Sequence, residues 1–386
     1  MRKRLAVVMS VWILLHIYVG VRLLSGAGLG GVGLALAWLG VVALGLAPLA
    51  AFAALSAERK LAGTVLYWGG FTAMGLSSIL IVLVLAADLL WVRGWVAARV
   101  VSMALVVSAV ALTALGTWRA RRPRIVRVVV PIVGLPPALA GFRIAQISDL
   151  HVGATIKRPF VDAVVDAVNA LDPDLIAFTG DVADGRVAAL AMEVAPLARL
   201  RAPEGKFFVS GNHEYYWDAP GWLRELERLG FTVLTNAHRV IARGSARLLV
   251  AGVTDRSTGH LVRGHASNPA TAVAGAPPSD VKVLLAHQPR SAFAAREVGF
   301  DLQLSGHTHG GQYFPFNVLV RLFQPFAHGL HRVGAMWLYV SRGTGYWGPP
   351  LRLGAPAEIT VIELQPAADA EAASSPQVLN EVTAPA

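Results

Sequence analysis

Five short polar motifs between residues 148 and 311 carry side chains that could bind metal ions. Each motif follows a short apolar run that predicts a β-strand. The motifs are Ser148-Asp149-Leu150-His151, Gly180-Asp181, Gly211-Asn212-His213-Glu214, Ala286-His287-Gln288-Pro289 and Gly306-His307-Thr308-His309-Gly310-Gly311. Loops at the carboxyl ends of strands are where α/β folds collect functional groups. The five motifs therefore predict one shared site.

The side chains in these motifs are two aspartates, one asparagine and four histidines that can serve as metal ligands. The candidate ligands are Asp149, His151, Asp181, Asn212, His287, His307 and His309. Carboxylate oxygen combined with imidazole nitrogen suits Mn²⁺, Fe or Zn²⁺ rather than Ca²⁺. In each Asp-x-His or His-x-His pair, an extended backbone would point both side chains to the same face. Such pairs, with a lone aspartate and an asparagine, predict two ions ~3.5–4 Å apart.

Each motif taken alone is a weak indication of chemistry. A single histidine near a strand end is commonly a core or surface residue, and Gly-Asp pairs often only form turns. We interpret the other histidines of the soluble part as core or surface residues. They are His238, His260, His265, His328 and His331. The order, strand context and spacing of all five motifs together favour a metal site.

Strands and helices alternate in the region that holds the motifs. The apolar patterns predict strands at 128–133, 143–148, 175–179, 207–210, 231–234, 248–253, 281–286, 302–305, 337–341 and 359–364, and helices at 160–171, 188–200 and 222–229. This alternation predicts an α/β core with partly parallel sheets. Residues 254–280 have weak periodicity and are a candidate loop or cap over the site.

Four apolar stretches occupy the first 120 residues, at 5–24, 29–55, 64–87 and 97–116. Each is close to the ~20 residues with which a helix crosses ~30 Å of hydrocarbon. A cleaved signal peptide is the alternative for the first stretch, but a second apolar stretch follows at once. His16 is the main ionisable residue in an apolar centre, and a packing role is its ordinary interpretation.

The chain has a formal net charge of +10, although only 15% of its residues are charged. Binding to nucleic acid is one interpretation of this balance. Membrane topology is the other, because arginines and lysines cluster beside the apolar stretches at Arg2, Lys3, Arg4, Arg119, Arg121, Arg122, Arg124 and Arg127. Both clusters and the Glu58-Arg59-Lys60 loop predict a multi-pass inner or cytoplasmic membrane protein with its downstream domain in the cytoplasm. The chain has no cysteine, which excludes disulfides and thiolate ligands.

The domain organisation follows from these patterns. We expect a transmembrane region of about four helices at 1–120, a basic linker with a first strand at 121–140, a catalytic domain at 141–365 and a disordered tail at 366–386.

Residues 141–364 resemble the calcineurin-like metallophosphoesterase superfamily, and most of all its bacterial membrane-associated branch. The resemblance rests on the five motifs, none of which lacks a ligand. It implies that Asp149, His151 and His309 bind one ion, that Asn212, His287 and His307 bind the other, and that Asp181 bridges both. His213 would be the catalytic histidine near the leaving group. The implied fold is a sandwich of two mixed β-sheets flanked by helices.

This resemblance implies a phosphoesterase with two divalent ions, for which Mn²⁺ is preferred over Fe or Zn²⁺. Two adjacent cations lower the pKa of a shared water, so that hydroxide can attack phosphorus near neutral pH. Asp184, Glu214 and Gln312 are weaker candidates for supporting a ligand or the substrate.

The expected substrate is a phosphodiester or pyrophosphate, carried by a lipid or a lipid-linked nucleotide in the bilayer. No nucleic-acid partner is expected, and the oligomeric state is left open. A nucleic-acid or nucleotide phosphodiesterase is one alternative. A membrane scaffold that binds metal without catalysis is the other.

Overall fold

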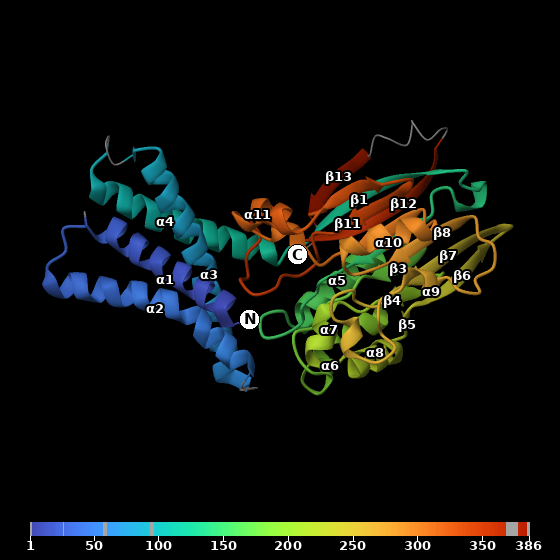
Figure 1. Cartoon of the computed structure of the whole chain (residues 1–386), viewed down its shortest axis with the longest axis horizontal. Helices are drawn as coiled ribbons and strands as arrows, with labels where there is room; N and C mark the ends of the chain where they lie inside the picture. Colours follow the sequence, from blue (N-terminus) through green and yellow to red (C-terminus); the bar gives the residue numbers. More distant parts are fainter. Residues whose placement is uncertain (1, 26, 57–59, 93–95, 368–376, 384–386) are drawn as a thin grey trace. The chain divides into compact units, whose positions relative to one another are not determined.

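The computed structural model of the chain contains two compact units (Figure 1). It describes residues 2–25, 27–56, 60–92, 96–367 and 377–383. One unit consists of Met1–Arg119 with two later segments, Tyr313–Pro315 and Gly348–Leu353, and the other consists of the remaining residues. Two segments of the expected catalytic region therefore belong to the N-terminal unit. Of the expected topogenic charges, Glu58 and Arg59 lie outside the described residues.

The N-terminal unit is built on four long helices. They are α1 (Arg2–Leu24), α2 (Gly31–Ser56), α3 (Lys60–Leu89) and α4 (Ala98–Ala120). Each is long and apolar enough to cross a membrane, over Ala6–Leu24, Gly31–Ala53, Gly63–Leu89 and Ala98–Ala120. The four predicted apolar helices are thus confirmed. Many of their large apolar side chains are exposed, as expected of helices that are hydrophobic all round and surrounded by lipid.

Small residues let the helices of this unit approach closely. A Cβ atom added to Gly70 of α3 would lie 2.4 Å from the carbonyl oxygen of Ala47 in α2. Such contacts are typical of helices that pack within a bilayer. His16 of α1 has its Nε2 3.1 Å from Ser77 Oγ of α3, and its Nδ1 2.9 Å from its own helix's carbonyl at Trp12. These contacts fit the packing role that the sequence suggested.

The two later segments pack into the core of the same unit. Tyr313 and Leu353 form a parallel bridge, and Tyr313 and Leu351 are buried among apolar residues of α1, α3 and α4. A Cβ atom on Gly75 of α3 would lie 2.2 Å from Leu351 Cδ1. The backbone N–H of Arg352 donates to the carbonyl of Gly116 in α4 at 3.0 Å.

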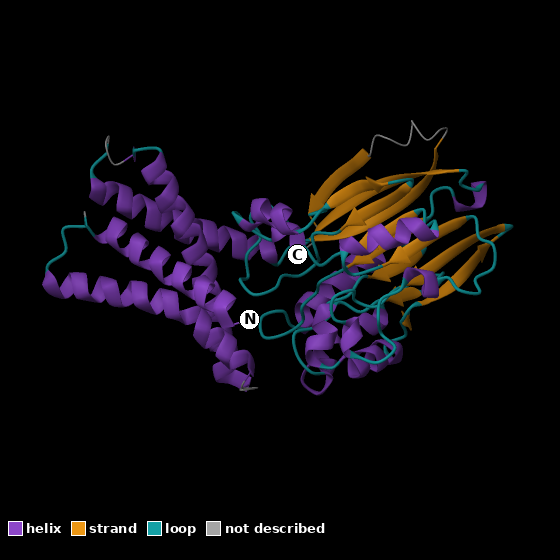
Figure 2. Cartoon of the chain, viewed as in Figure 1, coloured by secondary structure: helices purple, strands orange, loops and turns teal. Residues whose placement is uncertain are grey.

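The second unit contains two mixed β-sheets with helices on their outer faces (Figure 2). Among the described residues one sheet has the strand order β13-β1-β12-β2-β3-β4-β5 and the other has β10-β11-β9-β8-β7-β6. The strands are β1 (Arg124–Val133), β2 (Arg143–Ile147), β3 (Leu175–Phe178), β4 (Lys206–Phe208), β5 (Thr232–Val233), β6 (Ala237–Arg243), β7 (Ala246–Gly252), β8 (Val281–Leu285), β9 (Leu302–Ser305), β10 (Gly329–Val333), β11 (Met336–Val340), β12 (Glu358–Ala367) and β13 (Gln377–Thr383).

The helices of this unit are shorter. They are α5 (Arg158–Ala170), α6 (Val187–Val194), α7 (Asn212–Trp217), α8 (Ala219–Arg228), α9 (Pro269–Ala272), α10 (Ala292–Ala295) and α11 (Phe316–Phe323), with single 3₁₀ turns η2 (Pro137–Leu139), η3 (Ala195–Arg199), η4 (Gly259–Leu261), η5 (Pro289–Ser291), η6 (Arg296–Val298) and η7 (His309–Gly311).

Three apolar cores hold the layers together. The central core lies between the two sheets and contains Ile144, Leu175 and Phe207 from one sheet and Val250 and Leu304 from the other. A second core joins the first sheet to α5, α6 and α8, and a third joins the other sheet to α9 and α10. The predicted sandwich of two mixed sheets flanked by helices is confirmed.

The structure contains several short elements that the sequence did not predict. Strands β6 and β10 and helix α11 had no counterpart in the prediction, and residues 254–280 contain η4 and α9 within the expected loop. The expected disordered tail is wrong at two places, because residues 366–367 end β12 and 377–383 form β13, which pairs antiparallel with β1. The open edge of β1 offers unpaired backbone groups that an extended segment of any sequence can fill. Residues 368–376 and 384–386 lie outside the described part of the chain.

Candidate metal centre

All five motifs follow parallel strands, and the third begins helix α7 at Asn212. Strands β2, β3 and β4 are parallel neighbours in one sheet, and β7, β8 and β9 are parallel neighbours in the other. The carboxyl ends of parallel neighbours meet at one edge of a sheet, and the two sheets pack face to face. The chain therefore brings its polar loops together at one place.

One cluster of ligand atoms is formed by Asp149, His151 and His309. These atoms all lie within 4.8 Å of one another. His151 Nε2 lies 3.1 Å from His309 Nε2, and His309 Nε2 lies 3.6 Å from Asp149 Oδ1. Asp149 and His151 follow β2, whereas His309 comes from the loop after β9, so both sheets contribute.

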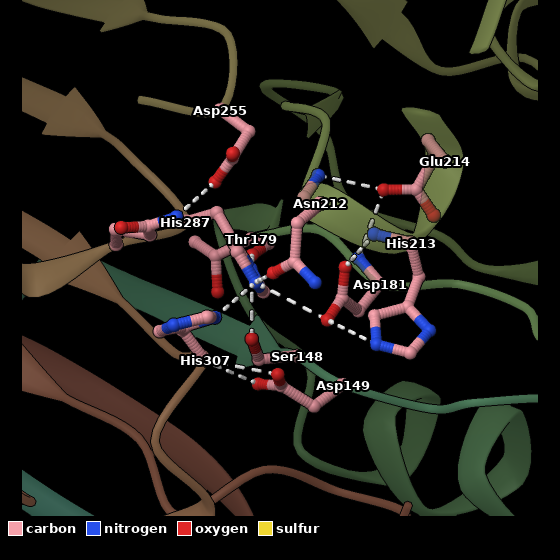
Figure 3. Close-up of polar contacts among 12 residues, drawn as sticks. Ser148, Asp149, Thr179, Asp181, Asn212, His213, Glu214, Asp255, His287 and His307 are labelled. Atoms are coloured by element: carbon pink, nitrogen blue, oxygen red, sulfur yellow. Dashed lines mark hydrogen bonds and ion pairs between the residues drawn. The ribbon is translucent and has the colours of Figure 1, made fainter. Parts of the chain in front are cut away.

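A second cluster is formed by Asp181, His287 and His307, with Asn212 beside it (Figure 3). His287 Nε2 lies 3.2 Å from Asp181 Oδ2, 3.2 Å from His307 Nδ1 and 3.2 Å from Asn212 Oδ1. Asp181 Oδ2 also lies 3.7 Å from His151 Nε2 of the first cluster. Asp181 thus lies between the two clusters, where a bridging ligand would be needed.

The backbone at five of the seven candidate ligands is left-handed rather than extended. Positive φ angles occur at Asp149 (55°), His151 (50°), Asp181 (57°), His307 (72°) and His309 (52°). The predicted reason for convergence, an extended backbone that points alternate side chains to one face, is therefore wrong. Non-glycine residues rarely adopt this conformation, and such outliers cluster at functional sites where the surrounding structure holds them.

Two glycines leave room for the ligand carboxylates. A Cβ atom on Gly306 would lie 2.2 Å from Asp149 Oδ2, and one on Gly211 would lie 2.1 Å from Asp181 Oδ1. Both positions therefore exclude any larger residue. Because the backbone at Gly306 comes so close to the Asp149 carboxylate, the N–H of His307 can donate to Asp149 Oδ1 at 3.0 Å.

His213 lies beside the two clusters and is held by Asp184. Its Nδ1 lies 2.6 Å from Asp184 Oδ1, and its Nε2 lies 4.0 Å from Asp181 Oδ2. The same Asp184 oxygen lies 3.0 Å from Nδ1 of His151. Asp184 therefore orients both a candidate ligand and the candidate catalytic histidine, and it leaves the Nε2 atom of each ring facing the site.

Burial and charge set the protonation of these groups. Burial would raise the pKa of Asp181, but the charges of His287 and His213 outweigh it and hold that pKa well below its usual range. Burial would lower the pKa of His213, but the charges of Asp181 and Asp184 raise it to about 9. Burial and the neighbouring charge of His287 lower the pKa of His307 to about 4. At neutral pH Asp181 is thus an anion, His213 holds a proton and His307 has a lone pair to offer.

Glu214 supports the turns that carry two of the ligands. Its buried carboxylate accepts backbone N–H groups from Asp181 at 3.0 Å, Val182 at 2.8 Å and Gly211 at 2.6 Å. Burial, with the charge of Asp181, raises the pKa of Glu214 to about 7. The side chain acts on the backbone and not on a ligand side chain.

Gln312, three residues after the ligand His309, donates its backbone N–H to the His309 carbonyl at 2.9 Å, and its side chain holds Trp347. Its Nε2 donates to the carbonyl of Trp347 at 2.9 Å and its Oε1 accepts the Trp347 N–H at 3.0 Å. The Trp347 ring in turn meets the edge of the His213 ring, as does the exposed Tyr216. The Gln312 side chain therefore positions an aromatic neighbour of His213. Tyr346, next to Trp347 in the chain, is buried in the core that joins the first sheet to α5, α6 and α8.

Two supporting residues were missed by the sequence analysis. The carbonyl of Thr179 accepts a hydrogen bond from His287 Nδ1 at 2.7 Å, which turns Nε2 toward the cluster. Asp255 accepts from Gln288 Nε2 at 2.8 Å, beside His287. Asp255 follows strand β7 as the ligands follow their strands, so its position after a predicted strand was a usable signal.

The donor set fits two divalent cations. Unprotonated ring nitrogens of two histidines 3.1–3.2 Å apart repel each other unless a proton or a cation lies between them, and both clusters contain such a pair. Each cluster also contains a buried carboxylate. Mixed oxygen and nitrogen donors suit first-row divalent metals.

Known proteins with similar sequences carry the same domain. The family profile described as calcineurin-like phosphoesterase matches residues 142–311. A Bos taurus protein described as a transmembrane protein with metallophosphoesterase domain is 41% identical over 64% of this chain and 58% of its own length. A Helicobacter pylori protein described as an uncharacterized metallophosphoesterase is 38% identical over 58% of this chain and 60% of its own length.

An Aquifex aeolicus protein, also described as an uncharacterized metallophosphoesterase, is 32% identical over 58% of this chain. That match covers 85% of the Aquifex protein. In contrast, the chain spans only about six-tenths of the bovine and Helicobacter relatives. The family profile, at residues 142–311, covers the five motifs.

Proposed function

Because the chain belongs to the calcineurin-like metallophosphoesterases, we propose that it is a membrane-anchored phosphoesterase whose site holds two divalent cations, Mn²⁺ in preference to Fe or Zn²⁺. The observation that carries the proposal is the pair of ligand clusters beside His213, which Asp184 holds. Asp181 Oδ2 lies 3.2 Å from His287 of one cluster and 3.7 Å from His151 of the other. A site that only held metal for structure would have no use for a spare acid at this position.

Seven side chains hold the cations in this proposal. Asp149, His151 and His309 hold the first, Asn212, His287 and His307 hold the second, and Asp181 contacts both. When bound, two such cations supply an activated water and positive charge for the phosphoryl oxygens.

His213 and Asp184 perform the proton chemistry. The Nε2–H of His213 points to the side of the clusters where the leaving oxygen would depart, and it gives that oxygen a proton as the ester bond breaks. Asp184 accepts the hydrogen bond from His213 Nδ1 and keeps the ring in this orientation. The water that attacks phosphorus provides the new P–O bond, so no covalent intermediate with the chain is needed.

The substrate we propose is a phosphodiester or pyrophosphate that belongs to a lipid or a lipid-linked nucleotide. Two observations support this choice. The chain has four helices suited to a bilayer, so its site stays near lipid. Two exposed side chains that touch the His213 ring, Tyr216 and Trp347, are aromatic rather than basic. A site built for nucleic acid would favour basic side chains along the path of the phosphates.

Hydrolysis and metal content test the two-cation proposal. Full-length protein in detergent should hydrolyse bis-p-nitrophenyl phosphate with added Mn²⁺, and a chelator should abolish this activity. Asp181→Asn should remove turnover and lower the bound metal from two ions per chain. Asp172→Asn is a matched control, because Asp172 is exposed and has a left-handed φ that asparagine tolerates. Activity that survives both the chelator and Asp181→Asn would contradict the proposal.

A substrate panel tests the lipid assignment separately. We expect faster turnover of nucleotide-linked or phosphatidyl lipids in vesicles than of cyclic nucleotides or single-stranded DNA. Preference for DNA or cyclic nucleotides would instead support the nucleotide phosphodiesterase. Metal binding with no turnover of any substrate would support the scaffold.

We also propose that the spans lie in the inner or cytoplasmic membrane. The catalytic domain would then lie on the cytoplasmic side. The chain has no cysteine, so single cysteines report accessibility cleanly. Ser25→Cys between the first two spans should react with an impermeant maleimide in intact cells. Ala188→Cys at the exposed surface of α6 should react only after permeabilisation. The reverse pattern would overturn the orientation.

A further inference from the structure

Helix α11 exposes apolar side chains that a water-soluble surface would hide. None of its residues is buried. Leu322 is 76% exposed, Phe323 71% and Val318 56%, and Phe314 just before the helix is 48% exposed. A surface helix of a soluble domain normally turns its apolar side to the core.

In α11 the apolar side chains instead lie on the outward side of the helix. Val318, Leu319, Leu322 and Phe323 form one stripe, since residues three and four apart share a helix face. The opposite side carries Asn317, which packs against the protein: a Cβ atom on Gly354 would lie 2.5 Å from its Nδ2. The side of α11 that carries the half-buried Asn317 and Val320 thus faces the domain, and the exposed apolar stripe faces outward.

The position of α11 in the chain links it to the membrane-spanning helices. It begins at Phe316, directly after the segment Tyr313–Pro315, which belongs to the N-terminal unit. Tyr313 is buried in the core of that unit among residues of α1, α3 and α4. Three residues of chain therefore connect the first turn of α11 to a side chain packed among the spans, which at ~3.5 Å per residue is a short tether.

We propose that α11, with Phe314, is an interfacial helix that inserts its apolar stripe into the lipid bilayer beside the spans. The bilayer is the occupant that these observations favour, because the spans and the short tether hold the stripe near lipid at all times. An amphipathic helix in this setting buries its apolar face ~5–10 Å into the boundary between headgroups and acyl chains. A second copy of the chain or a soluble partner would have to compete with that lipid.

Docking of α11 would reach the metal centre through the loop that precedes the helix. A Cβ atom on Gly311 would lie 2.3 Å from the carbonyl oxygen of Phe316 and 2.5 Å from the N atom of Asn317. Gly311 belongs to η7, the turn that begins at the ligand His309. This part of the inference rests on the proposed function, and it predicts faster turnover of a substrate held in the same bilayer.

Fluorescence depth measurements test the docking without reference to activity. Leu322→Cys would be labelled with the fluorophore NBD in the full chain and reconstituted into vesicles of phosphatidylcholine and phosphatidylglycerol. Met192→Cys is the matched control, because Met192 of α6 is an apolar residue exposed to a similar degree, 72%. Quenching by lipids that carry a doxyl group on the acyl chain should be at least ~2-fold stronger at position 322 than at 192.

Two results would overturn the proposal. One is equal, weak quenching at both positions, which would mean that the stripe faces water. The other is a blue-shifted signal at 322 that lipid quenchers do not reach and that rises with protein density, which would indicate a second copy.

A double variant supplies an independent measurement. Leu322→Glu with Phe323→Glu changes only exposed side chains, so metal content should be unchanged. Turnover of a vesicle-embedded phospholipid substrate should fall ~10-fold or more, while hydrolysis of soluble bis-p-nitrophenyl phosphate should stay within ~2-fold. Equal activity of the variant and the native chain on both substrates would contradict the link to turnover. A chain with no hydrolysis at all would contradict the proposed function and leave the fluorescence result to decide the docking.

Discussion

Asp184→Asn tests the arrangement on which the proposed chemistry depends most. A single oxygen of Asp184 lies 2.6 Å from Nδ1 of His213 and 3.0 Å from Nδ1 of His151. Asparagine keeps the size of the side chain, and its oxygen can still accept hydrogen bonds, but it lacks the charge that strengthens both bonds. The substitution should therefore weaken metal binding through His151 and acid catalysis through His213 without creating a cavity.

The expected magnitude follows from the two hydrogen bonds. A hydrogen bond to a charged group contributes about 1.5–3 kcal/mol. Since about 1.4 kcal/mol corresponds to a factor of ten in rate, the loss of one such bond should lower turnover ~10- to 100-fold. Loss of a residue that supports a metal ligand usually has an effect of the same size. The negative charge of Asp184 also raises the pKa of His213, so the variant's histidine should lose its proton at lower pH.

Leaving-group dependence separates the two effects. The assay would compare p-nitrophenyl and phenyl phosphodiesters at saturating Mn²⁺. The phenolate needs a proton from His213 far more than the nitrophenolate does, so the variant's loss should be about tenfold greater with the phenyl ester. The high-pH limb of the kcat profile should also move to lower pH.

The reasoning would be refuted by equal losses with the two leaving groups and an unmoved pH profile. That result would mean that Asp184 acts only through the fold or the metal. Asp172→Asn, at an exposed carboxylate, should behave as the native chain in both assays. Unfolding temperatures of both variants would exclude a loss of folded protein.

Two further predictions concern packing around the centre. Gly306→Ala should abolish metal binding, because its Cβ would lie 2.2 Å from Asp149 Oδ2; Gly30→Ala, which meets nothing within 4 Å, should retain two ions per chain by mass spectrometry. Trp222→Phe should lower the free energy of unfolding by about 1–2 kcal/mol, because the buried indole N–H donates to the carbonyl of Gly185 at 2.9 Å, and denaturant titration would measure it. Native metal content in Gly306→Ala, or unchanged stability in Trp222→Phe, would contradict these accounts.

The sequence by itself determined the layers and the chemical type of the site. Apolar length identifies a membrane helix because hydrocarbon thickness sets that length, as at Ala6–Leu24. Alternating strands and helices identify the α/β core, because the apolar repeat of each element places its apolar side chains on one face, which packs into the core. The ligand types were readable because Asp149 and His307, like the others, directly follow apolar strands.

Only the tertiary structure decided how those residues meet. The left-handed backbone at the ligands, such as Asp149 and His309, depends on contacts with distant loops and is disfavoured by local preference. The edge strand β13 depends on the neighbour that it pairs with, β1. The shared oxygen of Asp184, the packing of Tyr313 in the membrane unit and the contact between Asn317 and Gly354 that orients α11 all join residues far apart in the sequence. A local pattern contains no information about such pairs, because their energy arises only when the chain has folded.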